Sequence, residues 1–127
     1  VRSNSLARTQ LDTYLENAMP KELSFSPDAS RLTLIRRVYV DLLGLLPTAD
    51  QVRYWSENES DNWYEQMVEQ VLQSPAYGER WARHWLDAAG YADSDGVTLA
   101  DAERPWAWQY RDYVIRSLNS DKPYNRF

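Results

Sequence analysis

The stretch SPAYGERWARHWLDAAGYADSDG, residues 74–96, decides the fold. Ser74 followed by Pro75 is typical of the start of a helix, because serine caps free backbone amides and proline suits the first helical position. Apolar residues then recur at helical spacing, and the polar segment YADSDG follows them. The stretch therefore predicts an amphipathic helix that leads into a loop.

One face of this predicted helix is apolar and the other is polar. At about 100° per residue, the apolar arc holds Trp81, Ala82, Trp85, Leu86, Ala88 and Ala89. The polar stripe holds Arg80, His84, Asp87 and Tyr91. Aromatic residues at helical spacing usually pack in a core, so we expect Trp81 and Trp85 to be largely buried. His84 lies at the edge of the apolar arc, and we expect it to be partly buried and hydrogen-bonded to the loop over about 91–104.

The flanking sequence predicts further helices that proline and glycine separate. We expect them over about 5–18, 30–43, from Thr48, over 63–73 and from Pro105. Thr48 and Gln51 have the spacing of a capping box. The expected inward-facing residues include Leu32, Ile35, Val38, Tyr39, Leu42, Val52, Trp55, Tyr64, Met67, Val68, Val71, Leu72, Trp106, Tyr110, Val114, Ile115 and Leu118. Since no segment alternates like a strand, we predict one compact all-α bundle of about five to six helices, with one long irregular loop.

Composition excludes several classes of function. The chain has 127 residues, which fits one domain, and its net charge is -5. An acidic chain is poorly suited to nucleic acid, because phosphate contacts need clustered Lys and Arg. No apolar run approaches the roughly 18 residues of a membrane span, so we expect no membrane insertion. The sequence has no Cys, which excludes disulfides, a catalytic thiol and covalent C-x-x-C-H haem attachment within it.

Tryptophan and tyrosine are unusually frequent. The chain has 6 Trp and 9 Tyr but only 2 Phe. These two residue types combine a large apolar body with a polar tip, and so serve both cores and binding surfaces. Tyr91, Trp106 and Trp108 are therefore candidates for binding a ligand.

The polar stripe also supplies candidate catalytic residues. His84 is a candidate acid/base, Asp87 its orienting partner, and Arg80 or Arg111 a clamp for an anion. His84 is the only histidine, so a catalytic triad or a multi-histidine metal site would need a residue from another chain. The alternative is that the stripe is a solvated or ion-paired helix face, and we favour this structural interpretation.

The acidic loop is a weak candidate for a calcium site. Asp93, Asp95 and Gly96 match positions of the EF-hand pattern, but both essential ends of that pattern are missing. An irregular oxygen site could use the carboxylates of Asp93, Asp95, Asp101 and Glu103. We favour the simpler interpretation, in which these residues cap backbone amides in a turn.

Three segments carry a resemblance to a known family: LTLIRRVYVDLLGLLPT, SPAYGERWARHWLDAAGYADSDG and WAWQYRDYVIRSLNSDKPYNRF. From about Ser26 to Phe127 the chain resembles the planctomycete cytochrome-linked family, specifically its second PSCyt-type domain, a domain of unknown function. The family pattern is matched at Arg80, Trp81, His84, Trp85, Asp87, Tyr91, Asp93, Trp108, Arg111 and Asp112. Asp95 departs from it, since Asn or a similar polar residue is usual there. The resemblance transfers no catalytic residues.

The resemblance implies a context for the chain. Residues 1–127 would be a single helical domain cut from a larger, exported, multidomain protein located outside the cytoplasm. Haem would belong to a separate cytochrome c-like domain, and we expect no cofactor in this segment, with calcium as the one candidate ion. Neighbouring domains of the same polypeptide and polysaccharide are the expected partners.

Three hypotheses of function follow. The first is a non-catalytic helical module of a cytochrome c-linked protein that acts on or near polysaccharide or other polymers. The second is a hydrolase or oxidoreductase domain with its site around His84. The third is a glycan-binding module that stacks sugars on Trp106 or Trp108. A cleft around His84 would favour the second hypothesis, and exposed tryptophans would favour the third over the first.

Overall fold

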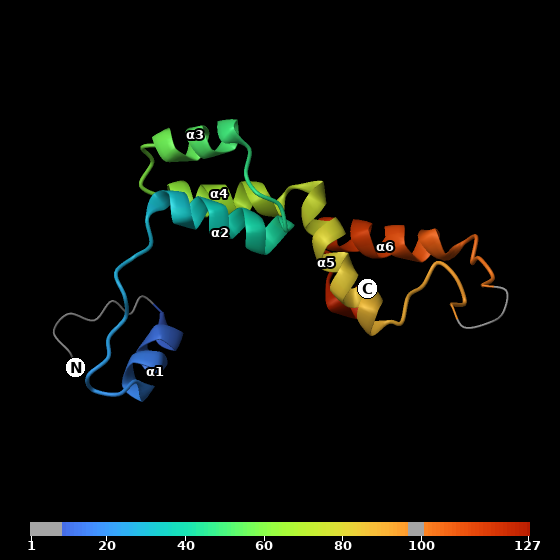
Figure 1. Cartoon of the computed structure of the whole chain (residues 1–127), viewed down its shortest axis with the longest axis horizontal. Coiled ribbons are helices and arrows are strands. Elements are labelled where there is room, and N and C mark those ends of the chain that lie inside the picture. Colours follow the sequence, from blue (N-terminus) through green and yellow to red (C-terminus); the bar gives the residue numbers. More distant parts are fainter. Residues whose placement is uncertain (1–8, 97–100) are drawn as a thin grey trace. The chain divides into compact units, whose positions relative to one another are not determined.

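The structure is a computed structural model that describes residues 9–96 and 101–127. Within these ranges the only strand-like pairing is an isolated antiparallel bridge between Ser94 and Glu103. The predicted all-α class is therefore confirmed, and Figure 1 shows the order of the helices. The elements are α1 (Gln10–Ala18), α2 (Arg31–Leu43), α3 (Ala49–Glu57), α4 (Trp63–Leu72), α5 (Pro75–Ala88), α6 (Ala107–Asn119) and the 3-10 helix η1 (Tyr124–Arg126).

Contacts divide the chain into two units, Val1–Ser30 and Arg31–Phe127. In the first unit, α1 begins after Thr9, whose side chain and that of Asp12 form a capping box. The expected residues 5–8 of this helix lie outside the described ones. No residue of α1 is buried. The prediction of a single domain over 1–127 stays a prediction.

In the second unit, α2 packs against α3 and α4 around a closed core. The core residues are Ile35, Val38, Tyr39, Trp55, Met67 and Val71. The indole N–H of Trp55 donates to the hydroxyl of Tyr39 at 3.3 Å, so the largest buried side chain keeps its polar atom paired. Leu32 and Tyr64, which were expected to face inward, are exposed. Each is the second residue of its helix, so it lies at the helix end and not among the central core residues.

The predicted cap of α3 is present. The amide of Gln51 donates to the Thr48 hydroxyl at 3.3 Å, and the amide of Thr48 donates to the Gln51 side chain at 2.8 Å. These two bonds satisfy two backbone donors that no helical carbonyl can reach. The capping box thus sets where α3 begins, and Trp55 of this helix packs in the core with residues of α2.

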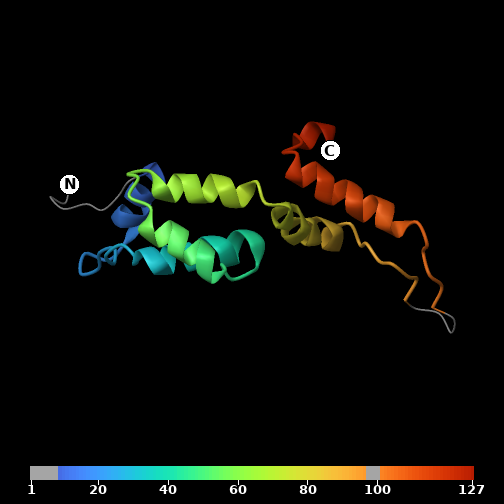
Figure 2. The same ribbon diagram turned by 90° about the horizontal axis from the view of Figure 1, so that it is seen from above.

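Helices α5 and α6 form an antiparallel pair, and Figure 2 shows α6 lying beside α5. α5 begins at Pro75 after Ser74, as predicted. Near this end, the side chain of Asn119 accepts from the amide of Gly78 at 2.8 Å and donates to the carbonyl of Pro75 at 3.1 Å. A Cβ at Gly78 would lie only 2.5 Å from the Asn119 side chain, so only glycine permits this approach.

Two predictions for α5 are wrong. Trp81 is 38% exposed, and its indole N–H donates to the carbonyl of Leu42 in α2 at 3.1 Å. His84 is exposed rather than partly buried, and its ring contacts Trp81 edge-on at 5.4 Å between centroids. Trp85 is only partly buried, against a core formed by Ala82, Leu86 and Val114. The apolar arc of α5 therefore contacts α2 on one side and α6 on the other, and residues at the edges of the arc remain exposed to solvent.

Candidate functional site

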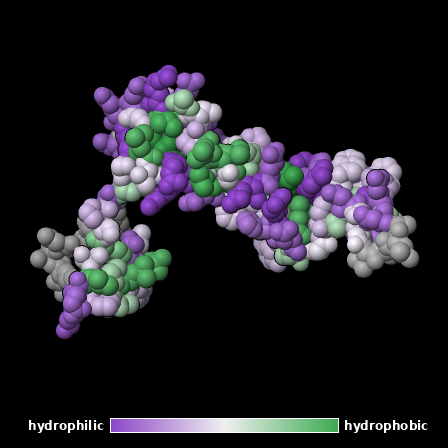
Figure 3. All heavy atoms as spheres, in the orientation of Figure 1, coloured by the Kyte–Doolittle hydropathy of each residue, from purple (hydrophilic) through white to green (hydrophobic). Residues whose placement is uncertain are grey.

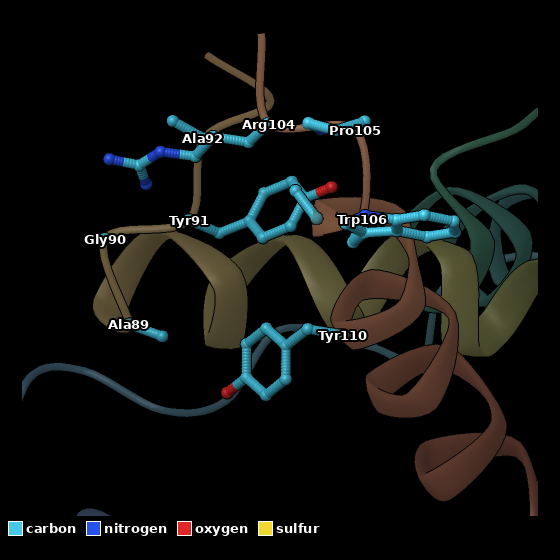
Figure 4. A pocket seen from close by; sticks show the side chains of 9 residues that line it. Ala89, Gly90, Tyr91, Ala92, Arg104, Pro105, Trp106 and Tyr110 are labelled. Carbon is cyan, nitrogen blue, oxygen red and sulfur yellow. The ribbon is translucent and has the colours of Figure 1, made fainter. Parts of the chain in front are cut away.

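An open cleft of about 420 Å³ lies where α5 ends and α6 begins. Its most prominent side chains are the rings of Tyr91, Trp106 and Tyr110, which Figure 4 shows around the cleft. We call it the aromatic cleft, and its lining is Ala89, Gly90, Tyr91, Ala92, Arg104, Pro105, Trp106, Ala107 and Tyr110. Gly90 turns the chain out of α5 with a φ of +65°, a conformation that other residues rarely adopt. This turn brings Tyr91 next to the start of α6.

The three rings differ in how they are held. Trp106 is 69% exposed, although sequence analysis placed it on an inward-facing stripe. Tyr110 was also expected to face inward and is exposed, but its hydroxyl accepts from the indole N–H of Trp85 at 2.9 Å. The rings of Tyr91 and Tyr110 lie 6.5 Å apart between centroids. The cleft thus has two supported walls and one wide, open indole face.

The two arms of the loop between α5 and α6 are joined beside the cleft. The amide of Asp95 donates to the carbonyl of Ala102 at 3.0 Å, and the amide of Arg104 donates to the carbonyl of Asp93 at 2.8 Å. The guanidinium Nε of Arg104 also donates to the carboxylate of Asp95 at 2.7 Å. These contacts connect the arm that carries Tyr91 to the arm that carries Trp106.

Three of the four candidate calcium ligands have a local role in this loop. Asp93 accepts from the hydroxyl of Tyr91, Asp95 pairs with Arg104, and Asp101 accepts from the amide of Gly96 at 2.8 Å. That backbone hydrogen bond lowers the pKa of Asp101 below its usual value. In the part of the chain that the structure describes, no three His, Cys, Asp or Glu residues are grouped to hold a metal ion. Calcium binding stays the less favoured alternative, to be tested by titration.

Tyr91 is electrostatically distinct. Its hydroxyl donates to the Asp93 carboxylate, and this hydrogen bond is the main reason that the pKa of Tyr91 is raised. Ionising the phenol would lose the hydrogen bond and place a second negative charge beside Asp93. The ring therefore stays neutral and oriented at ordinary pH.

A second cleft of about 420 Å³ shares Tyr91 with the first and lies between α5 and α6. We call it the polar cleft, and its lining is Glu79, Ala82, Arg83, Leu86, Asp87, Tyr91, Asp93, Arg111 and Ile115. Arg111 also contacts the Asp112 carboxylate at 3.3 Å. Charged groups of both signs here surround an apolar floor.

The structure brings together only part of the predicted site. Asp87, Asp93 and Arg111 meet at the polar cleft, with Tyr91 as its shared wall. Arg80 instead lies against Gly44 at the end of α2, where a Cβ would come within 2.9 Å of its side chain.

The other candidates lie apart from both clefts. His84 lines neither of them, so the proposed acid/base is not beside Asp87 in a cavity. Trp108 also lines neither cleft, although it is 45% exposed. The roles suggested for these residues stay predictions.

Tyr110, Arg104 and Glu79 also line the clefts, although none of them was predicted as a site residue. Tyr110 fits the apolar period of α6 and was assigned to the core for that reason. Arg104 acts through Asp95, nine residues away, across a loop without periodicity. The one local signal was the density of aromatic residues in PWAWQY, residues 105–110, directly after an irregular loop.

None of the helices in the described ranges has both the length and the apolar character needed to cross a bilayer.

Comparisons place the chain among known sequences. No curated protein matches the chain, and no solved structure does. Residues 10–127 match PSCyt2, described as a protein of unknown function (DUF1549), and the chain therefore belongs to the PSCyt2 family.

Proposed function

We propose that this chain is a non-catalytic helical module that binds a polysaccharide through the aromatic cleft. The observation that carries this proposal is the exposed indole of Trp106 beside Tyr91 and Tyr110 in one open cleft. Isolated exposed aromatics are common, but three rings that line one concave surface are typical of a binding site.

The cleft has the chemistry that a sugar ring requires. A pyranose has an apolar C–H face that packs on an aromatic ring, and hydroxyl groups at its edge that need hydrogen-bond partners. Trp106 supplies the open face, and the rings of Tyr91 and Tyr110 form the walls, with their hydroxyls held by Asp93 and by the indole of Trp85. The neighbouring polar cleft, which shares Tyr91, offers carboxylates and guanidinium groups to the next part of a chain-like ligand.

A wider context belongs to the same proposal. We place the module outside the cytoplasm, in a planctomycete-type multidomain protein whose haem is held by a separate cytochrome c-like domain. The sequence motifs that resemble such proteins support this context. Binding to polymer would then keep the partner domains close to their substrate, since linked modules raise the effective concentration at a surface.

Isothermal titration calorimetry with a panel of neutral oligosaccharides tests the proposal. We expect saturable binding by the wild-type chain, and a loss of affinity of about tenfold or more in Trp106→Ala. Trp108→Ala is the matched control, because Trp108 is an exposed tryptophan of the same region that lines neither cleft. Absence of binding to every oligosaccharide, or equal affinity in Trp106→Ala and wild type, would reject the proposal.

A second candidate function is docking to a neighbouring domain of the same polypeptide. It is favoured by the exposed side chains of Leu45 and Leu46, which follow the α2 carbonyl that Trp81 contacts. Figure 3 shows strongly hydrophobic atoms on the surface of this part of the second unit. Co-expression with the adjacent domain tests it: Leu46→Asp should abolish the complex, and Trp106→Ala should leave it intact.

A further inference from the structure

We propose that Asp93, Asp95 and Arg104, which we call the loop staple, position Tyr91 and Trp106 for ligand binding. This inference rests on the proposed function, because it assigns the residues that hold the aromatic cleft in its binding geometry. None of the three needs to touch the sugar, so they are positioning residues.

The staple connects the two arms that carry the walls. One arm leaves α5 through Tyr91, and the other enters α6 through Pro105 and Trp106. Asp93 contacts both arms: its carboxylate accepts from the Tyr91 hydroxyl, and its carbonyl accepts from the Arg104 amide. The orientation of Tyr91 and the path of the chain into Trp106 therefore depend on the same residue.

The ion pair between Asp95 and Arg104 closes the staple. The Nε atom of Arg104 lies 2.7 Å from the carboxylate of Asp95, which is nine positions away in the sequence, and both side chains are about half exposed. Figure 4 shows the Arg104 guanidinium on the side of the loop remote from Trp106. The side chain is thus directed toward the opposite arm rather than into the space between the rings.

The energetics point to a local role. An exposed ion pair contributes little to global stability. Its loss would nevertheless loosen the two arms, which only their backbone hydrogen bonds would then join, and the ligand would have to order them at a cost in affinity. Fixing the arms in advance is the expected function of a pair that lies at the edge of a cleft and outside the hydrophobic core.

Charge substitution in the 127-residue chain tests the inference, with calorimetric affinity for the best-binding oligosaccharide as the main measurement. We expect Asp95→Asn to weaken binding by about three- to fivefold with an unchanged melting temperature. The reversed pair, Asp95→Arg with Arg104→Asp, should restore most of the affinity. Asp50→Asn is the matched control, because it removes an exposed ion pair of 3.2 Å with Arg53 on α3, and it should leave binding unchanged.

A second measurement needs no ligand. We expect the order parameter of the Trp106 indole N–H to fall in Asp95→Asn and to recover in the reversed pair. If the wild type binds sugar and Asp95→Asn binds equally well, the inference fails and the proposed function stands. If the wild type binds no sugar, the proposed function fails. If Asp95→Asn also leaves the order parameter of the Trp106 indole N–H unchanged, the positioning role is overturned as well. Failure of the reversed pair to restore both quantities would also overturn it.

Discussion

Two regions of the second unit use tryptophan in opposite ways. Among α2, α3 and α4, Trp55 is 2% exposed and its indole N–H is bonded to Tyr39. At the end of the α5–α6 pair, Trp106 is 69% exposed and lines an open cleft. The same type of side chain is therefore enclosed in the core in one region and presents an open face in the other. If the proposed function holds, stability and ligand recognition are properties of different ends of this unit.

The largest effect is expected from emptying the closed core. Trp55→Ala should lower the free energy of unfolding by about 3–5 kcal/mol, because it leaves a cavity and removes the partner of the Tyr39 hydroxyl. Urea denaturation measures the change, and Trp106→Ala should cost no more than about 0.5 kcal/mol in the same experiment. Equal costs for the two variants would remove the contrast between the regions.

Trp85 sharpens the comparison, because it belongs to the α5–α6 pair, as the aromatic cleft does, but is partly buried. Its ring lies 4.3 Å from that of Phe127 between centroids, and its indole N–H is bonded to Tyr110. We expect Trp85→Ala to cost about 1–3 kcal/mol, less than Trp55→Ala. A cost as large as that of Trp55→Ala would show that the α5–α6 pair is as closed as the core of α2 to α4.

His84 should contribute little to stability. The ring is exposed and contacts Trp81, so His84→Ala should change the free energy of unfolding by no more than about 0.5 kcal/mol. Diethyl pyrocarbonate should modify this histidine readily in the native chain. Protection of His84 from the reagent would contradict its exposed position and restore the structural role that sequence analysis assigned to it.

The pKa values of two tyrosines near the α5–α6 pair should be shifted in opposite directions. The hydrogen bond to Asp93 raises the pKa of Tyr91, whereas the hydrogen bond from the Lys122 ammonium, at 2.9 Å, lowers the pKa of Tyr113. In a titration followed by NMR of the ring carbons, Tyr113 should therefore ionise first and Tyr91 last of the two. The contribution of this hydrogen bond to the stability of the folded chain is fully present below the pKa that tyrosine has in the unfolded chain, about 10. The contribution is lost as the pH rises through the higher pKa of Tyr91 in the folded chain.

Asp93→Asn provides the control for this titration. It removes the negative charge next to the phenol, so the pKa of Tyr91 should fall toward its ordinary value while that of Tyr113 stays unchanged. The reverse order of titration in the wild type would contradict the hydrogen bonds described for the two rings.

Calcium should have the smallest effect of all. The carboxylates of Asp93, Asp95 and Asp101 already accept hydrogen bonds or pair with Arg104, so we expect no change in melting temperature when calcium is added. A site at 100 times its dissociation constant would add about 2.7 kcal/mol, which a thermal melt detects easily. A clear rise in melting temperature would show that the open region contains a metal site in addition to the clefts.

Local sequence rules predicted the elements well. Ser74 and Pro75 marked the start of α5, although the side chain of Ser74 makes no capping hydrogen bond there. Thr48 with Gln51 marked the start of α3, because a capping box depends on residues that are close in sequence. The apolar stripes of α2 and α4 correctly identified Ile35, Met67 and the other core residues. These predictions required only helical periodicity and the chemistry of helix ends.

The faces that stay open could not be predicted in the same way. A helical wheel shows which residues share a face, but not how much of that face a neighbour covers, and so Leu32, Trp81 and Tyr110 were assigned to the interior. Beside the aromatic cleft, the amide of Arg104 donates to the carbonyl of Asp93 across a loop that has no helical period. Such contacts between distant residues leave no local pattern in a single sequence.

The most direct test of the central claim is an NMR titration of the indole N–H signals with a neutral oligosaccharide. The chain has six tryptophans. We expect the Trp106 signal to shift progressively to saturation, while the Trp55 signal, from the closed core, stays in place. Binding that leaves the Trp106 signal unchanged, or addition of sugar that shifts no indole signal, would contradict the assignment of the aromatic cleft as the sugar-binding site.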